Sequence, residues 1–231
     1  MGKRIAIIQS NYIPWKGYFD IIGLVDEFII YDEVQYTKND WRNRNRIKTP
    51  TGIQWITIPV FQKSLKQKIS ETEVTTSKWG VKNWQTIKGN YSRAPHFKPL
   101  SSELEEFYCT STLTRLSEIN ISLLTKICGM IGIRTKITNS ADYELKGDPT
   151  EKLINLCKQA GAECYLSGPA AKSYLRENMF SQEGIRVEWM DYSGYPEYTQ
   201  LYPPFTHHVS IIDLLFNTGK DCIHYMKCGK I

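Results

Sequence analysis

The residues best suited to chemistry lie in one stretch near the start of the chain, residues 9–19 (QSNYIPWKGYF). Its aromatic side chains offer flat faces for a base or a sugar, together with hydroxyl and indole donors. Gly17 allows a ligand to approach a helix N-terminus, whose free N–H groups favour an anion. The alternative interpretation is a proline–aromatic turn that packs on a sheet. The predicted substrate-binding residues here are Gln9, Tyr12, Trp15, Gly17 and Tyr18, and the predicted catalytic residues are Tyr12 and Lys16.

A second candidate site is the basic stretch at residues 41–48 (WRNRNRIK). Residues 36–50 contain five basic side chains and one acidic side chain, so they carry +4 of the net charge of +5. Alternate residues of an extended strand share a face, so Arg42, Arg44 and Arg46 would form a clamp for a phosphate or a carboxylate. RNA is a competing ligand, and a solvated edge strand is the structural alternative. The predicted substrate-binding residues here are Gln35, Trp41, Arg42, Asn43, Arg44, Asn45, Arg46 and Lys48.

Four further residues follow apolar runs or precede a helix. Asp32 comes directly after the second apolar run, and Ser167 ends a predicted strand before Gly168 and Pro169. In a wound sheet, ligands bind at such strand ends. His207 and His208 lie before the last predicted helix, and their role stays open because adjacent side chains point in different directions.

The composition places the chain among ordinary globular proteins: it has 231 residues, of which 41% are hydrophobic and 23% are charged. The apolar runs are far shorter than the ~20 residues that span a bilayer, and no signal-peptide pattern follows Lys3 and Arg4. We therefore expect a soluble, cytoplasmic protein without a membrane span. The six cysteines include no C-x-x-C pair, which favours reduced thiols. We predict no metal site.

These residues must be positioned by alternating strands and helices, a pattern that predicts a Rossmann-like α/β fold with a wound, mostly parallel sheet. Period-two alternation on both sides of a Pro/Gly turn predicts an inserted β-hairpin at about residues 42–60. We expect one domain over residues 1–231, with the insertion at about 36–74 and a helical segment at about 78–130. Further predicted strands are 3–9, 27–31, 69–74, 135–138, 162–167 and 185–190, and further predicted helices are 17–25, 101–109, 150–160, 170–179 and 210–217.

The first strand, loop and helix resemble those of nucleotidylyl transferases and class I aminoacyl-tRNA synthetases. Those proteins carry the motif H-x-G-H, in which two imidazoles act on phosphates. This chain has Trp15-Lys16-Gly17-Tyr18 at the equivalent place, so both histidines are missing. If ATP chemistry takes place here, Lys16 and the aromatic donors must replace them.

Several motifs in order resemble the WbqC-like family over nearly the whole chain. The matching patterns are Q-x-x-Y-x-P-W-x-G-Y-F at 9–19, D-x-x-Q-Y at 32–36, W-x-N-R-N-x-I-K at 41–48, G-x-x-W-x-T-x-P-V at 52–60, Y-L-S-G-x-A at 165–170 followed by Tyr174, and S-I-I-D-L-L-F-N-x-G at 210–219. Members of this family look like proteins encoded in gene clusters for O-antigens and other surface polysaccharides. The resemblance therefore implies a transferase that modifies a nucleotide-activated amino sugar by N-aminoacylation, with glycyl as the type of acyl group.

This resemblance also implies roles and partners. Arg42, Arg44 and Arg46 would hold phosphates, and Asp32 would orient an amine or accept its proton. Ser167 and Tyr174 would add contacts to the substrate. Amide formation needs an activated acyl group, so ATP-Mg or a charged carrier such as aminoacyl-tRNA is implied. A nucleotidylyl transferase or ATP-dependent adenylating enzyme, and a non-enzymatic module that binds a nucleotide sugar or RNA, are the alternatives.

Overall fold

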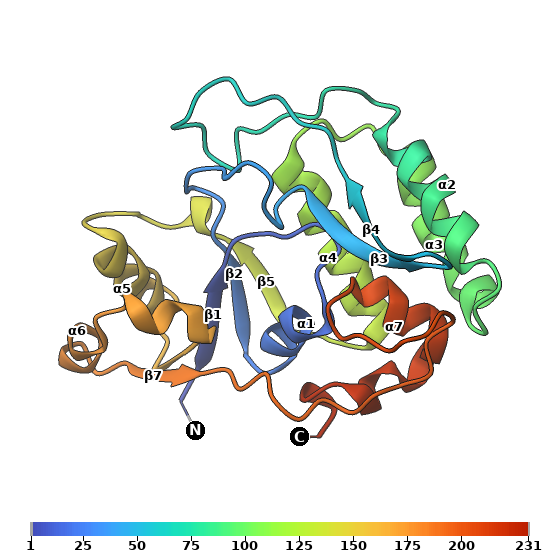
Figure 1. The fold of residues 1–231 in the computed structure, drawn as a ribbon. Helices are drawn as coiled ribbons and strands as arrows, with labels where there is room; N and C mark the ends of the chain where they lie inside the picture. Colours follow the sequence, from blue (N-terminus) through green and yellow to red (C-terminus); the bar gives the residue numbers. More distant parts are fainter. Residues whose placement is uncertain (1, 231) are drawn as a thin grey trace.

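The computed structural model describes residues 2–230 and contains a five-stranded, all-parallel sheet between two layers of helices (Figure 1). Numbered along the chain, the sheet strands follow the order 3-2-1-4-5, which is the order of Rossmann folds. The predicted fold class is therefore confirmed. From edge to edge the strands are β5 (Lys136–Asn139), β2 (Glu27–Ile30), β1 (Arg4–Ile8), β6 (Cys164–Ser167) and β7 (Arg186–Trp189).

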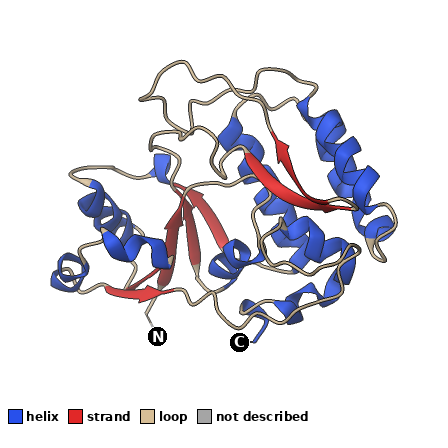
Figure 2. Cartoon of the chain, in the orientation of Figure 1, coloured by secondary structure: helices blue, strands red, loops and turns tan. Residues whose placement is uncertain are grey.

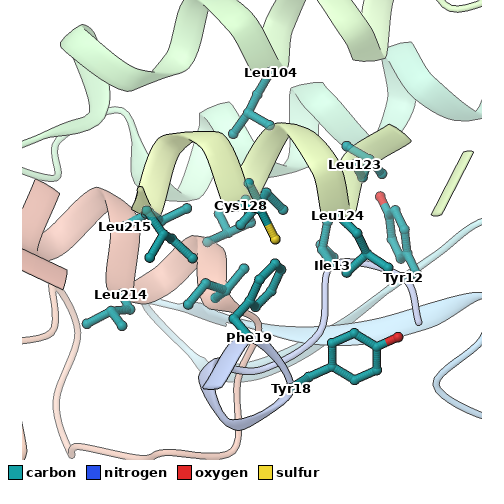
Figure 3. Packing of buried hydrophobic residues seen from close by; sticks show 14 of the residues in the cluster. Tyr12, Ile13, Tyr18, Phe19, Leu104, Leu123, Leu124, Cys128, Leu214 and Leu215 are labelled. Carbon is teal, nitrogen blue, oxygen red and sulfur yellow. The ribbon is translucent and has the colours of Figure 1, made fainter. Parts of the chain in front are cut away.

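Both faces of the sheet are buried because alternate side chains of each strand enter two different hydrophobic clusters. Ala6, Phe28 and Ile30 join the first cluster, with the helices α1 (Lys16–Gly23) and α4 (Leu116–Ile131). Ile5, Ile7 and Ile29 join the second cluster, with α5 (Pro149–Gln159) and α6 (Glu177–Gln182). Figure 3 shows the first cluster, in which Tyr12 and Ile13 lie beside Leu123 and Leu124 of α4.

The inserted hairpin forms a separate two-stranded sheet, as the alternation of residue types predicts. Strand β3 (Arg44–Thr49) pairs antiparallel with β4 (Gly52–Thr57), and Gly52 closes the turn with a φ of 117°. Ile47 and Ile56 are buried on the inner face. Two long loops, between β2 and β3 and between β4 and α2 (Trp79–Tyr91), lie above the carboxyl ends of the parallel strands (Figure 2).

Two local predictions are wrong, and the bounds of a third differ. Residues 69–74 do not form a strand, because their bridges go to different partners: Val74 pairs with Val60, whereas Glu73 pairs with Arg115. Residues 170–179 do not form one helix: a 3-10 helix (Pro169–Ser173) ends early, the buried Leu175 turns toward the second cluster, and α6 begins at Glu177. The helix predicted at 101–109 is α3 (Phe97–Thr110), which begins earlier because its proline lies in the first turn, where no N–H is needed.

The last part of the chain packs back onto the first helix. After β7 an irregular aromatic segment leads to α7 (Ile211–Thr218), followed by 3-10 helices at Gly219–Tyr225 and Cys228–Lys230. Asp20 of α1, which is fully buried, accepts hydrogen bonds from the Tyr195 hydroxyl and from the backbone N–H groups of Lys227 and Cys228. The aromatic segment is therefore held firmly although it lacks regular structure.

Within residues 2–230, none of the helices has the length and apolar character needed to cross a bilayer. The same residues contain no group of three His, Cys, Asp or Glu side chains arranged to hold a metal ion.

Candidate functional site

The candidate site is a cleft of about 910 Å³ at the carboxyl ends of β1 and β6. Strand order reverses between these two strands, which is where ligands bind in wound α/β sheets. The β1–β6 ladder pairs Arg4 with Cys164 and Ile5 with Tyr165, whereas β1 and β2 pair over four positions. Pairing between β1 and β6 is therefore confined to the start of the two strands, and the cleft lies at their carboxyl ends.

Predicted and unpredicted residues together line this cleft. Gln9 and Ser167 lie at the ends of β1 and β6, where the sequence places them. The far wall comes from the first turn of α5 and from residues 168–176. Five of the predicted substrate-binding residues line the cleft: Gln9, Trp15, Tyr18, Ser167 and Tyr174.

The loop after β1 presents its aromatic side chains to the cleft in a defined way. The Tyr18 hydroxyl donates to the Gln9 carbonyl at 2.8 Å, which holds the ring against the end of β1. The Trp15 ring lies 5.1 Å from the ring of Tyr192, and both residues line the cleft. Gly17 lies under Trp15, so its predicted role as a point of close approach is filled by the indole of the same chain.

The charged groups of the cleft lie on its far wall. Asp148 caps α5 by accepting from the N–H groups of Thr150 and Glu151, and its carboxylate also pairs with Arg176. These contacts, Arg176 first, lower the pKa of Asp148. Lys152 lines the same wall. Two cations against one ionised carboxylate leave the cleft suited to an anionic ligand.

Asp32 lies outside the cleft and is fully buried. Its carboxylate accepts hydrogen bonds from the Ser10 N–H at 2.8 Å, the Ser10 hydroxyl at 2.6 Å and the Ser117 hydroxyl at 2.5 Å. Burial raises its pKa, although these hydrogen bonds and the nearby Arg42 act in the opposite direction. Asp32 thus ties the loop after β1 to the end of β2 and to α4.

The other two predicted catalytic side chains are also buried away from the cleft. The Tyr12 hydroxyl lies 2.9 Å from the Tyr108 hydroxyl and accepts from Asn83 at 3.0 Å. Lys16 extends beneath the aromatic segment, where its Nζ lies 4.6 Å from the centre of the Tyr195 ring. Burial lowers the pKa of Lys16 to about 8.

The three arginines do not share one face as predicted, because the chain still turns at residues 41–43 and extended alternation begins only at Arg44. Arg42 turns toward the cleft loop, where it donates to Asn11 and to Gln9, the latter at 3.4 Å, and lies 3.6 Å from Asp40. Arg44 and Arg46 instead lie on the outer face of the hairpin.

The remaining predicted residues mostly hold the hairpin in place. Asn45 donates to the carbonyls of Tyr12 and Ile13, fixing a turn in which Ile13 has a φ of 35°. The Asn43 amide donates to Ile58, and the Lys48 ammonium donates to Gln200 at 3.0 Å. Gln35 is exposed and pairs with Lys68, away from the cleft. Trp41, Asn45 and Arg46 line a second, smaller hollow of about 190 Å³, together with Asn11, Pro14, Trp15 and His208.

Sequence reasoning missed the far wall of the cleft. The helix predicted at 150–160 was not assigned to the site, although a helix that begins at the carboxyl edge of a parallel sheet presents its first turn to the site. The sequence does not predict that Tyr31 and Tyr192 line the cleft, because residue type and spacing do not show on which side of the sheet each side chain lies. The chemistry-bearing residues missed are Asn11, Tyr31, Asp148, Thr150, Lys152, Tyr165, Arg176 and Tyr192.

The strand order and the cleft at its reversal define a Rossmann-like α/β protein with a candidate binding site at the carboxyl ends of its strands. The chain belongs to the WbqC-like protein family, which matches residues 9–225. It is 52% identical over 226 residues to the protein named "Uncharacterized protein Rv1507c" of Mycobacterium tuberculosis, with 97% of this chain and 98% of that protein covered. No solved structure matches the chain.

Proposed function

We propose that the protein is a transferase that forms an amide on the amino group of a nucleotide-linked sugar, with an aminoacyl group of the glycyl type as the transferred group. The product would serve the synthesis of O-antigen or another surface polysaccharide. The observation that carries the proposal is the cleft at the carboxyl ends of β1 and β6. Its volume, its aromatic walls and its two cations, Lys152 and Arg176, suit a nucleotide sugar.

The two ends of such a substrate match different walls. The aromatic rings of Trp15 and Tyr192 suit a base or a sugar ring, which stacks on flat apolar faces. Lys152 and Arg176 suit a diphosphate, since a guanidinium binds phosphate oxygens in a bidentate manner. Asp148 is the carboxylate among the described lining residues, so we assign it the contact with the sugar amine. Because Arg176 keeps it ionised, it acts by orienting the amine rather than as a strong base.

The reaction requires an activated acyl donor. The amine nitrogen forms a bond to the acyl carbon, the bond between that carbon and its leaving oxygen breaks, and the oxygen takes the electron pair. The amine loses one proton to solvent or to the leaving oxygen. An acyl adenylate made with ATP-Mg, or an aminoacyl ester on a carrier such as tRNA, supplies this leaving oxygen, whereas a free amino acid does not.

The placement of the first helix disfavours the alternative of a nucleotidylyl transferase. Such enzymes use the start of this helix for phosphates, but here the Trp15 indole covers Gly17 and Lys16 points away under Tyr195. None of the histidines of residues 2–230 lines the cleft. A binding module without turnover remains the competing function, and the experiment must separate it from a transferase.

The test combines binding with a search for product. Thermal melting is measured with UDP- and dTDP-linked amino sugars and with the matching hydroxyl sugars. The ligand that binds is then incubated with glycine and ATP-Mg, or with charged bulk tRNA, and the sugar is analysed by mass spectrometry. The proposal expects selective stabilisation by an amino sugar and a mass gain of one aminoacyl residue.

A matched pair of variants tests whether the nucleotide sugar binds in the cleft. Lys152→Ala should weaken nucleotide-sugar binding, whereas Lys98→Ala, on the exposed face of α3, should not. Binding without any product under both donor conditions would identify a binding module, and pyrophosphate release from a nucleoside triphosphate in the presence of a sugar phosphate would identify a nucleotidylyl transferase.

A further inference from the structure

The outer face of the β3–β4 hairpin carries arginine side chains on β3 and a tryptophan side chain on β4. The register places Arg46 opposite Trp55 and Arg44 opposite Thr57, so these four share one face. The guanidinium of Arg44 lies 4.2 Å from the centre of the Trp55 ring, and that of Arg46 lies 5.3 Å from the centre of the Trp41 ring. The two indole rings are 5.4 Å apart.

Both tryptophans are unusually exposed for their type: 39% of Trp41 and 43% of Trp55 is open to solvent. Packing within this face does not account for that exposure, because burial of an indole is strongly favourable. Exposed aromatic rings next to arginines are typical of surfaces on which nucleobases stack.

The Arg46 guanidinium has its hydrogen-bonding capacity unused. Within residues 2–230 it forms no ion pair and no hydrogen bond: its Nε–H is buried without a partner, and the group lies against the two indole rings. Among the same residues, none that lines the hollow beside Arg46 is acidic. A stacked guanidinium with free donors is suited to a phosphate that lies beside a stacked base.

The same chemistry continues on the other side of Trp55. A groove of about 850 Å³ between β4 and α2 has Trp55 in its wall, and its charged lining residues are Lys78 and Lys82. The groove and the hollow adjoin where the rings of Trp55 and Trp41 meet, and neither lining contains an acidic side chain among residues 2–230. We refer to this surface as the basic strip; its rings are Trp41 and Trp55, and its cations are Arg44, Arg46, Lys78 and Lys82. Figure 1 shows the hairpin between the carboxyl end of β1 and α2, so the strip spans the region from α2 to the cleft.

The strip ends at the candidate active site. Asn11 and Trp15 line both the small hollow and the cleft, and Arg42 joins Asn11 and Gln9 at the boundary. A flexible chain that stacks on Trp55 and Trp41 can thus continue past Arg46 and place its end against Trp15.

We infer that this strip binds the single-stranded 3′ end of an RNA and that the RNA is the acyl carrier for the reaction in the cleft. This inference rests on the proposed function and names its donor. The amine of the sugar then attacks the ester carbon of the aminoacyl-RNA, the ester C–O bond breaks, and the terminal ribose hydroxyl leaves with the proton that the amine gives up. A free nucleotide needs one stacking position. The strip offers two indole rings and four cations, which suits a chain of several nucleotides.

The test is direct RNA binding, measured without any turnover by fluorescence anisotropy. The probes are a synthetic RNA hairpin with a single-stranded 3′ tail ending in CCA, the same hairpin with a blunt end, and heparin as a competing polyanion. We expect the tailed hairpin to bind about tenfold or more tightly than the blunt one. Affinity should also fall steeply with salt.

Variants assign the binding to the strip. Trp55→Ala should weaken binding of the tailed hairpin about tenfold or more, whereas Trp55→Tyr should restore most of it because a phenol ring also stacks. Arg46→Ala should lower the slope of log affinity against log salt concentration by about 0.7. Arg134→Ala is the matched control, since Arg134 is exposed at the amino end of β5, at the opposite edge of the sheet. Melting temperatures confirm that each variant is folded.

The possible outcomes separate this inference from the proposed function. Equal binding of tailed and blunt hairpins, or equal losses in Arg46→Ala and Arg134→Ala, overturns the inference. Aminoacylation of the sugar with glycine and ATP-Mg alone, without RNA, overturns the carrier role while the proposed function stands. Tail-dependent RNA binding without transfer from charged RNA to any amino sugar supports the strip as an RNA site and overturns the proposed function together with the carrier role.

Discussion

The indole of Trp15 lies directly on Gly17: a Cβ atom on residue 17 would be 2.4 Å from Cζ2 of Trp15. The ring therefore occupies the space where a side chain at the start of α1 would be. In this position it covers the helix N-terminus and presents its other parts to the cleft and to the hollow beside the hairpin.

Substitution Gly17→Ala should destabilise the protein, although alanine favours helices more than glycine does. The added methyl group displaces the indole, and we expect a loss of about 1–3 kcal/mol in the free energy of unfolding. In a Trp15→Ala background the loss should disappear, which urea denaturation of the four proteins of the cycle would show. Gly89→Ala is the control, because a Cβ there meets nothing within 4 Å. A penalty that persists without the indole contradicts the steric explanation.

Substitution Asp32→Asn should affect stability and activity together. Asp32 accepts three hydrogen bonds from Ser10 and Ser117 while fully buried, so its replacement leaves donors without an ionised acceptor. We expect a loss of about 1–3 kcal/mol in the free energy of unfolding. Ser117→Ala should reproduce part of that loss. A large fall in turnover with unchanged stability would instead support the catalytic role predicted from the sequence.

Substitution Lys16→Met should change how stability depends on pH. Burial lowers the pKa of Lys16 from 10.5 to about 8 in the folded protein. Between these values the unfolded chain still holds the proton that the folded protein has released, so the stability contributed by Lys16 rises with pH. Relative to Lys16→Met, the wild-type protein should gain about 2–3 kcal/mol between pH 8 and pH 10.5.

The comparison is made by urea denaturation across that range. Lys48, whose pKa burial also lowers, is present in both proteins and cancels from the difference. Lys98→Met, which removes an exposed lysine, should show a flat difference. A flat difference for Lys16→Met as well would mean that Lys16 is more hydrated than the structure indicates.

Substitution Asp148→Asn should strengthen the binding of nucleotide diphosphates. Asparagine caps a helix about as well as aspartate does, so α5 should keep its start. The substitution removes the charge that pairs with Arg176, so the guanidinium becomes available to phosphate. We expect a few-fold gain in affinity by isothermal titration. Glu183→Gln, which removes the partner of Lys158 outside the cleft, should leave affinity unchanged. Weaker binding in Asp148→Asn would assign the carboxylate itself a contact with the ligand.

The sequence was sufficient for the fold class and for five of the residues that line the candidate cleft. Alternation of strands and helices predicts the parallel sheet, and the loop after the first strand predicts Gln9, Trp15 and Tyr18 at the cleft. It was not sufficient for Tyr12 and Lys16, because residue type alone does not tell a tyrosine or lysine that faces a ligand from one that is buried by a distant segment. Lys16 is covered by Tyr195, which lies far along the chain. Arg176 was missed for the same reason: its partner Asp148 lies on another helix.

The short ladder between β1 and β6 also bears on how firmly the two halves of the sheet are joined. Paired positions at Arg4 and Ile5 join the two halves of the sheet near its amino edge, while β1 with β2 and β6 with β7 are each paired over four positions. Fewer paired positions hold this seam than hold either half, so we expect its backbone amides to exchange with solvent faster than those between β1 and β2. We expect any rotation of one half of the sheet against the other to take place at this seam, where it would change the width of the cleft between β1 and α5.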